Sequence, residues 1–231
     1  MFNLWQSILQ ALKLLASFDP ELWGIVGVSL KVSVAAALIA AALAVPLALL
    51  VTQHEFAGKR AAIGLVNSLM AVPAVVIGLL VYLLFSRSGP LGALQLLYSQ
   101  GAMVVAQALL ALPLMTGLCV AALQGVPPLA RETMLTLGAT RLQSVGGVAR
   151  EARFALTAAF IAGLARVLGE TGMTMMVGGN IKGDTRVMTT AIALETMKGN
   201  FELGIALGIV LLIVAIAINV ALQSVQGRAG Q

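Results

Sequence analysis

The chain has 231 residues, of which 60% are apolar and only 10% are charged, and its formal net charge is +5. A soluble domain carries about 25% charged residues, so this composition excludes an ordinary soluble protein and indicates one membrane domain over residues 1–231. The positive charges are scattered through loops without a basic cluster, which disfavours nucleic acid as a partner and fits membrane lipid. One Cys and one His predict no metal site, and we expect no cofactor.

The first 18 residues predict an amphipathic helix that lies in the membrane interface. Their apolar side chains recur at helical spacing, whereas the polar side chains lie elsewhere on the helix. Asp19-Pro20 then ends this helix, because the residue before a proline avoids the helical conformation. The apolar stripe consists of Leu4, Trp5, Ile8, Leu12 and Leu15.

Five later runs are long enough to cross about 30 Å of hydrocarbon, which takes roughly 20 residues. The sequence therefore predicts an all-α polytopic helix bundle with five transmembrane helices. Pro46, Pro73 and Pro113 fall inside the first three runs, where prolines kink membrane helices. The runs are Ile25–Val51, Ala61–Phe85, Ala102–Leu123, Phe154–Val177 and Leu203–Leu222.

The connections between the runs alternate between two sides of the membrane. Residues 52–60 and 124–153 fall on one side with the C-terminus, and residues 86–101 and 178–202 fall on the other side with the N-terminus. Lys and Arg are divided almost evenly between the sides, so the positive-inside rule barely decides the orientation. No Walker A, phosphate-loop or nucleophile-elbow pattern occurs, and we expect no catalytic site.

The connection at residues 124–153 is polar and has a helix–turn–helix pattern. Pro127-Pro128 can open a helix, since a missing N–H is harmless in the first turn. Residues 128–137 alternate apolar and polar side chains at helical spacing, and Gly138 can close the helix in a left-handed conformation. A second helix is expected from about Arg141, outside the lipid.

This connection resembles the EAA loop of ABC-importer permeases. Glu132, Gly138 and Val148 are in register with that pattern. The departures from it are Thr133 and Met134 in place of two alanines, and Arg150-Glu151 in place of Leu-Pro. The other interpretation is an ordinary amphipathic loop between membrane helices.

The resemblance implies the type I architecture of ABC-importer permeases, with a homodimer in the prokaryotic cytoplasmic membrane. Two ATPase subunits would bind the 124–153 loop, which places this loop and the C-terminus inside and the N-terminus outside. The chain itself would not be an enzyme. The residues expected to couple to the ATPase are Glu132, Thr133, Gly138, Ala139 and Arg141.

Two charges, Arg166 and Glu170, lie inside the fourth run, four residues apart and therefore on one helix face. An ionised side chain at the centre of a membrane helix costs about 2.5–3.5 kcal/mol, so we expect the two to pair, within or between subunits. The pair either fixes helix packing alone or also lines a translocation pathway. The residues assigned to the pair or the pathway are Arg166, Glu170, Thr171 and Thr174.

Four other stretches resemble oxyanion importers and are most similar to tungstate permeases. They are residues 70–73, 86–92, 169–181 and 185–196. The resemblance implies an extracytoplasmic oxyanion-binding protein and tungstate as the cargo. Permeases for molybdate, sulfate or phosphate are the alternatives, and a secondary transporter of another class is a more distant one.

Residues 186–197 predict a short helix on the outer surface. In the family such an element contacts the binding protein, whereas the alternative is simple cover for the mouth of the bundle. The residues assigned to this contact are Arg186, Thr189 and Thr190.

Overall fold

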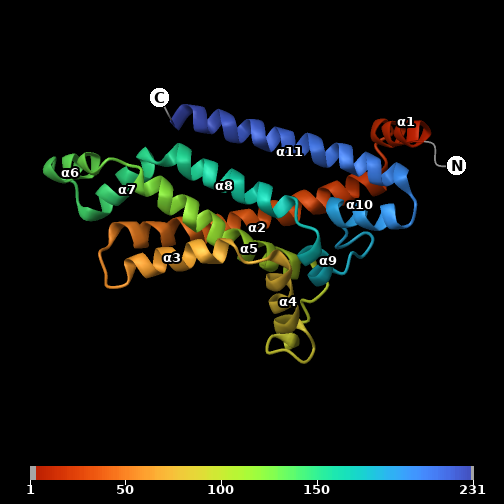
Figure 1. The fold of residues 1–231 in the computed structure, drawn as a ribbon, viewed down its shortest axis with the longest axis horizontal. Coiled ribbons are helices and arrows are strands. Elements are labelled where there is room, and N and C mark those ends of the chain that lie inside the picture. Colours follow the sequence, from red (N-terminus) through yellow and green to blue (C-terminus); the bar gives the residue numbers. More distant parts are fainter. Residues whose placement is uncertain (1–3, 230–231) are drawn as a thin grey trace.

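The computed structural model describes residues 4–229, and over this range the chain is helical without strands (Figure 1). The predicted all-α class is therefore confirmed. The elements are α1 (Leu4–Ala16), α2 (Pro20–Gln53), α3 (Lys59–Met70), α4 (Ala74–Phe85), a 3-10 turn η1 (Gly92–Leu94), α5 (Gln100–Gln124), α6 (Pro128–Thr136), α7 (Arg141–Glu151), α8 (Arg153–Leu168), α9 (Gly172–Gly178), α10 (Met188–Met197) and α11 (Phe201–Ala229).

Helices α2 and α5 form the centre of the bundle. With 34 residues, α2 is about 51 Å long and exceeds the ~30 Å hydrocarbon core of a bilayer. Ala37, Ala40 and Ala44 of α2 are completely buried in one cluster with Ala111 of α5, because small side chains let two helices approach closely. Helix α8 packs on both, and α11 covers α8, so the four run side by side along the long axis (Figure 1).

The membrane-spanning helices are of two kinds. Helices α2, α5 and α11 are continuous and long and apolar enough to cross a membrane. The other two predicted runs are broken: α3 and α4 meet at 94°, and α8 and α9 meet at 67°. The prediction of one continuous helix in each of these runs is wrong, and five spans result only if each bent pair counts as one.

The prolines act differently in the three runs. Pro46 and Pro113 lie inside α2 and α5 without ending them. Pro73 instead stands directly before α4, in extended conformation, where Ala71–Pro73 separate the two helices. A proline removes one helical N–H and disfavours the helical conformation of the preceding residue, and of the three prolines only Pro73 coincides with a break.

The predicted interfacial helix is present as α1. It packs on α11 through Ala11, which is completely buried, whereas Trp5 is exposed. The Asp19 side chain accepts a hydrogen bond from the Leu22 N–H at 2.9 Å and caps α2, so Asp19-Pro20 begins the next helix as well as ending the first. Residues 1–3 and the Leu4 side chain lie outside the described part of the chain, and the place of α1 in the membrane interface stays a prediction.

Several helix contacts pair a glycine on one helix with a methionine on another. A Cβ atom added to Gly178 would lie 2.7 Å from Met103 Sδ, and real Cβ contacts essentially never come below 3.0 Å. The glycine therefore leaves the space that the methionine fills, and the unbranched thioether chain adapts to irregular gaps. The pairs are Gly78–Met173, Gly117–Met70, Gly147–Met134, Gly163–Met115 and Gly178–Met103.

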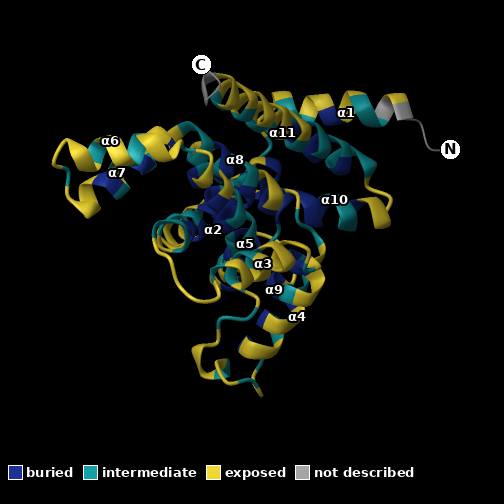
Figure 2. Cartoon of the chain, turned by 60° about the vertical axis from the view of Figure 1, so that its left-hand side comes forward, coloured by how far each residue is buried: buried dark blue, intermediate teal, exposed yellow. Residues whose placement is uncertain are grey.

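Burial is concentrated where α2, α5, α8, α9 and α10 meet, and exposed residues dominate α4 and α6 (Figure 2). Helix α3 contains no buried residue although it belongs to an apolar run. Between α2, α3, α4 and α5 the bend encloses an apolar groove of about 570 Å³, with Leu47, Leu69, Leu80 and Leu112 in its wall. A single chain thus leaves apolar surface of α3 and α4 uncovered by its own residues.

Candidate functional site

Helices α6 and α7 form the helix–turn–helix that the sequence predicts. Pro127 precedes α6 in extended conformation, and Pro128 is the first residue of the helix. Gly138 adopts φ +88°, a left-handed conformation that favours glycine. The turn is closed by hydrogen bonds from the Gly138 N–H to the Leu135 carbonyl, at 3.1 Å, and from the Ala139 N–H to the Met134 carbonyl, at 3.0 Å.

The second helix of this pair has its own cap. The Gln143 N–H donates to Thr140 Oγ1 at 3.3 Å, and the Thr140 N–H donates to Gln143 Oε1 at 2.8 Å. This reciprocal capping box satisfies two of the N–H groups that a helix start leaves free. Both ends of the glycine turn are therefore fixed by local hydrogen bonds, so the turn does not depend on packing against the bundle.

The α6–α7 pair extends beyond one end of the bundle (Figures 1 and 2). Exposed leucines gather on it: Leu137 is 83% exposed and Leu142 is 82% exposed. Clustered apolar side chains on a polar, exposed element are typical of a protein contact surface. Of the residues assigned to ATPase coupling, the exposed ones are Glu132, Thr133, Gly138 and Arg141, and Ala139 is half-buried.

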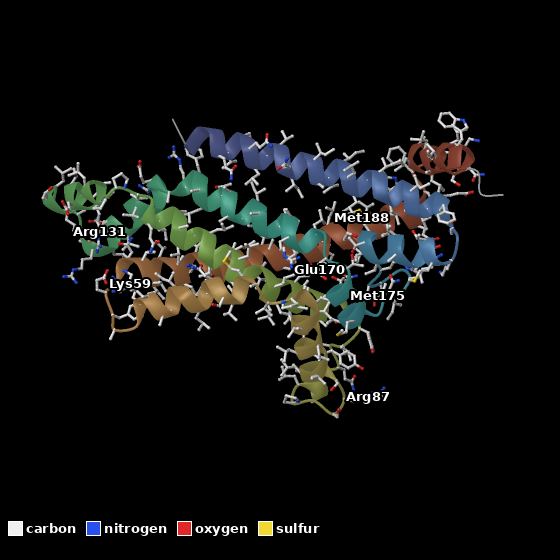
Figure 3. All side chains as sticks on the ribbon, viewed as in Figure 1. Lys59, Arg87, Arg131, Glu170, Met175 and Met188 are labelled. Carbon is white, nitrogen blue, oxygen red and sulfur yellow. The ribbon has the colours of Figure 1, made fainter. Side chains whose placement is uncertain are left out.

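The second candidate region is the break between α8 and α9, where Arg166 and Glu170 form an ion pair. Arg166 Nη1 lies 3.4 Å from Glu170 Oε2. The predicted pairing is confirmed, but the prediction that both residues lie on one continuous helix is wrong, because α8 ends at Leu168 and Glu170 lies in the break. Figure 3 shows Glu170 inside the bundle between α8 and α9, near Met188 at the start of α10.

Glu170 ends one helix and begins the next. Its Oε1 accepts a hydrogen bond from the Met173 N–H at 3.2 Å, which caps the first turn of α9. Its carbonyl oxygen accepts from Thr174 Oγ1 at 3.2 Å and from Thr189 Oγ1 at 2.9 Å. The break leaves the Glu170 carbonyl without a helical N–H donor. Two hydroxyl groups donate to it instead, one of them from α10, and this satisfies a backbone group that would otherwise be buried without a partner. Thr171 is half-buried and makes no capping bond.

A buried amide continues this polar group into α5. Gln107, only 2% exposed, donates from Nε2 to Thr174 Oγ1 at 3.4 Å. Neither Gln107 nor the contact of Thr189 with Glu170 was predicted from the sequence. A lone amide inside the apolar run 102–123 was the available signal for Gln107, since a polar group there needs a partner.

The structure turns the residues assigned to the binding-protein contact inward. Thr190 is completely buried and Thr189 nearly so, and the Arg186 side chain is only 10% exposed. Thr190 Oγ1 accepts from the Val187 N–H at 3.1 Å and so caps α10. These three side chains hold the short helix in place, and the assignment of them to an exposed contact is corrected accordingly.

A charge network holds α10 and the loop before it. Arg186 Nη1 lies 3.7 Å from Glu195 Oε1, and Lys198 Nζ lies 3.0 Å from the same oxygen. Asn200 Nδ2 donates to Glu195 Oε2 at 3.0 Å. Burial alone would raise the pKa of the Glu195 carboxyl, but the hydrogen bonds from Lys198 and Asn200 and the nearby Arg186 together lower it. Glu195 is therefore a buried anion with its charge compensated.

The sequence of this chain matches the family described as the binding-protein-dependent transport system inner membrane component over residues 29–230. The chain belongs to that family. This permease is thus a multi-pass inner-membrane protein and a subunit of an ABC transporter.

Two relatives of this chain are tungstate uptake permeases. The permease is 42% identical to the tungstate uptake system permease protein TupB of Peptoclostridium acidaminophilum over 216 residues, 94% of this chain and 95% of that relative. It is 38% identical to TupB of Campylobacter jejuni over 165 residues, 71% of this chain and 69% of that relative.

A solved structure shares the fold. It is a bacterial alginate ABC transporter in complex with an alginate pentasaccharide-bound periplasmic protein, which matches with a TM-score of 0.69 at 17% identity, over 90% of this chain and 79% of that one.

Proposed function

We propose that the permease imports tungstate in an ATP-driven transporter. The observation that carries this proposal is the 42% identity with a tungstate uptake permease over 94% of the chain. A match of that extent includes the membrane helices, the α6–α7 pair and the break at Glu170, so it is not confined to one shared motif. Molybdate, sulfate and phosphate remain the competing cargoes, because all are tetrahedral oxyanions.

The α6–α7 pair is the contact for a cytoplasmic ATPase dimer. Its exposed leucines and its rigid glycine turn support this role, since a fixed element transmits a partner's motion better than a flexible one. The C-terminus then lies inside and α1 outside. ATP is hydrolysed by the partner, and this chain performs no chemistry of its own.

The permease works as a homodimer. Helix α3 has no residue buried by its own chain, and the groove of about 570 Å³ beside it is lined almost entirely by apolar side chains. The connection at residues 86–99, at the end of α4, contains Gln95 and Tyr98 at positive φ. Irregular backbone is not tolerated against lipid, and a second copy packed along α3 and α4 would shield it.

An extracytoplasmic oxyanion-binding protein contacts the end of the bundle that carries α10. The exposed residues around the charge network are Lys182, Met197 and Lys198, and these take the place of the buried Arg186, Thr189 and Thr190 as the contact surface. The translocation pathway passes the break between α8 and α9, where Arg166, Glu170, Thr171 and Thr174 lie.

The test is uptake by proteoliposomes that contain the permease with its ATPase and binding protein. We expect ATP-dependent uptake of tungstate that excess tungstate abolishes and excess sulfate leaves nearly unchanged. Preferential competition by molybdate or sulfate would assign a different cargo. Uptake driven by a proton gradient without ATP would reject the ABC mechanism in favour of a secondary transporter.

A further inference from the structure

At the break, Glu170 is more buried than Arg166 and makes more hydrogen bonds. The Glu170 side chain is 11% exposed and the Arg166 side chain is 44% exposed. Glu170 is fixed by the Met173 N–H and, through its carbonyl, by Thr174 and Thr189. Within the described residues, Arg166 makes one long contact of 3.4 Å, from Nη1 alone. Because a guanidinium has five N–H donors, most of its binding capacity is unused in the single chain.

The surroundings of Arg166 leave the guanidinium uncovered. Ala162 lies one turn before Arg166 on α8, and Gly169, three residues after it, follows the end of the helix; they carry a methyl group and no side chain, respectively. A Cβ added to Gly169 would have only the Ala165 carbonyl oxygen near it, at 3.9 Å. The 44% exposure of the Arg166 side chain means that its guanidinium is accessible from outside the single chain.

The position of Arg166 along α8 disfavours lipid as its neighbour. It is the fourteenth residue of α8, about 20 Å along the helix axis from the first residue. A charged side chain facing hydrocarbon at such depth costs about 2.5–3.5 kcal/mol. The exposed part of the guanidinium therefore faces water or protein, as a residue on a translocation pathway does.

We propose that Arg166 binds the transported oxyanion directly and that Glu170 is its counter-ion when no anion is present. This inference rests on the proposed function and adds the residue that contacts the cargo. The arriving dianion displaces the single Oε2 contact, and Glu170 keeps its hydrogen bond to the Met173 N–H. Arginine suits this exchange because its planar fork of donors matches the geometry of an oxyanion.

Because Glu170 competes with the anion for Arg166, the pathway has a low affinity for the anion. An importer needs this low affinity so that the anion is released. A free arginine would retain a tetrahedral dianion, whereas a carboxylate fixed beside it competes for the same donors and repels the anion. The anion can then bind for long enough to pass and is released once Arg166 returns to Glu170. Cargo selection stays with the binding protein, since any small oxyanion fits such a site.

The experiment measures tungstate binding to the purified permease–ATPase complex, without binding protein, by equilibrium dialysis. Glu170→Gln keeps an oxygen for the Met173 N–H but removes the charge, so we expect tungstate to bind at least about tenfold more tightly than to the wild type. Arg166→Gln should abolish this binding, and Arg166→Lys should restore part of it through charge alone.

Arg87→Gln is the matched control. Arg87 is an exposed arginine in the connection after α4, outside the long helices, and the described residues offer it no ion-pair partner. We expect this variant to bind tungstate like the wild type. Equal loss of binding in Arg87→Gln and Arg166→Gln would overturn the proposal, because it would assign the effect to overall charge.

Other results separate this site from the cargo assignment. Unchanged affinity in Glu170→Gln, with normal thermal stability, overturns the proposal even if Arg166→Gln fails to fold. Loss of the dimer mass in Arg166→Gln, measured by light scattering, would make Arg166 a subunit contact and also overturn it. The same pattern of variants obtained with sulfate as with tungstate would support the site, and the uptake competition in the presence of the binding protein tests the cargo separately.

Discussion

Substitution of Gly138 by valine perturbs the α6–α7 turn without touching the membrane bundle. At φ +88° a residue with a Cβ pays about 1–2 kcal/mol of strain, and a β-branched residue is a true outlier there. Nothing else opposes the side chain, because a Cβ at Gly138 would have no atom within 4 Å. The cost is therefore conformational strain and not a clash, and it lowers the equilibrium constant between the native turn and its alternatives about 5- to 30-fold.

The consequence should appear in coupling. We expect Gly138→Val to insert in the membrane and dimerise normally, while tungstate uptake per ATP hydrolysed falls at least about fivefold. Proteoliposomes with the complete transporter give both rates in one preparation. The substitution changes the geometry of the turn, because the hydrogen bonds from the Gly138 and Ala139 N–H groups to the end of α6 form only when residue 138 is in the left-handed conformation.

Two controls separate geometry from side-chain volume. The Gly138→Asn permease should take up nearly as much tungstate per ATP hydrolysed as the wild type, since asparagine tolerates the left-handed conformation. Gly146→Ala, on α7 where an added Cβ has no atom within 4 Å, should also be neutral. Wild-type coupling in Gly138→Val would refute the reasoning that this turn transmits motion to or from the ATPase.

Further predictions concern packing, charge and topology. Gly163→Ala should lose about 1–3 kcal/mol of stability against unfolding in mixed micelles, because the added methyl meets the methionine that fills this space; Gly208→Ala, with no atom within 4 Å of its Cβ, should lose almost nothing. The folded-state pKa of Glu195 is lowered, so its stabilising effect is complete above its unfolded pKa of about 4.5 and is lost as the pH falls below that value. Glu195→Gln should therefore flatten the acid side of the stability curve, and an unchanged curve would contradict the network. In a variant without the native cysteine, a cysteine at Lys13 should react with an impermeant reagent from outside and one at Gln226 should not; the reverse labelling would invert the orientation.

The features that follow from local chemistry could be predicted from the sequence. Pro128 at the start of α6 and Gly138 after its end define the helix pair, because their effects act within one turn of the backbone. The Arg166–Glu170 contact was predictable for the same reason, since the two residues are four positions apart.

The features that depend on distant segments could not be predicted. The break after Leu168 exists because Glu170 caps α9 and because Thr189, from α10, satisfies the freed carbonyl. Nothing near residue 170 in the sequence specifies the approach of α10. The same holds for Arg186, whose burial against Glu195 requires that the loop folds back on the helix that follows it.

The contacts between glycine and methionine make five helix junctions visible to spectroscopy. A methionine ε-methyl group gives a sharp resonance even in a large detergent complex, and here each such group reports on one named pair of neighbours. Met70 monitors α3 against α5, Met103 and Met115 monitor α9 and α8 against α5, Met173 monitors α4 against α9, and Met134 monitors α6 against α7. One labelled amino acid would thus show, in a single spectrum, which junctions move when ATP binds to the partner.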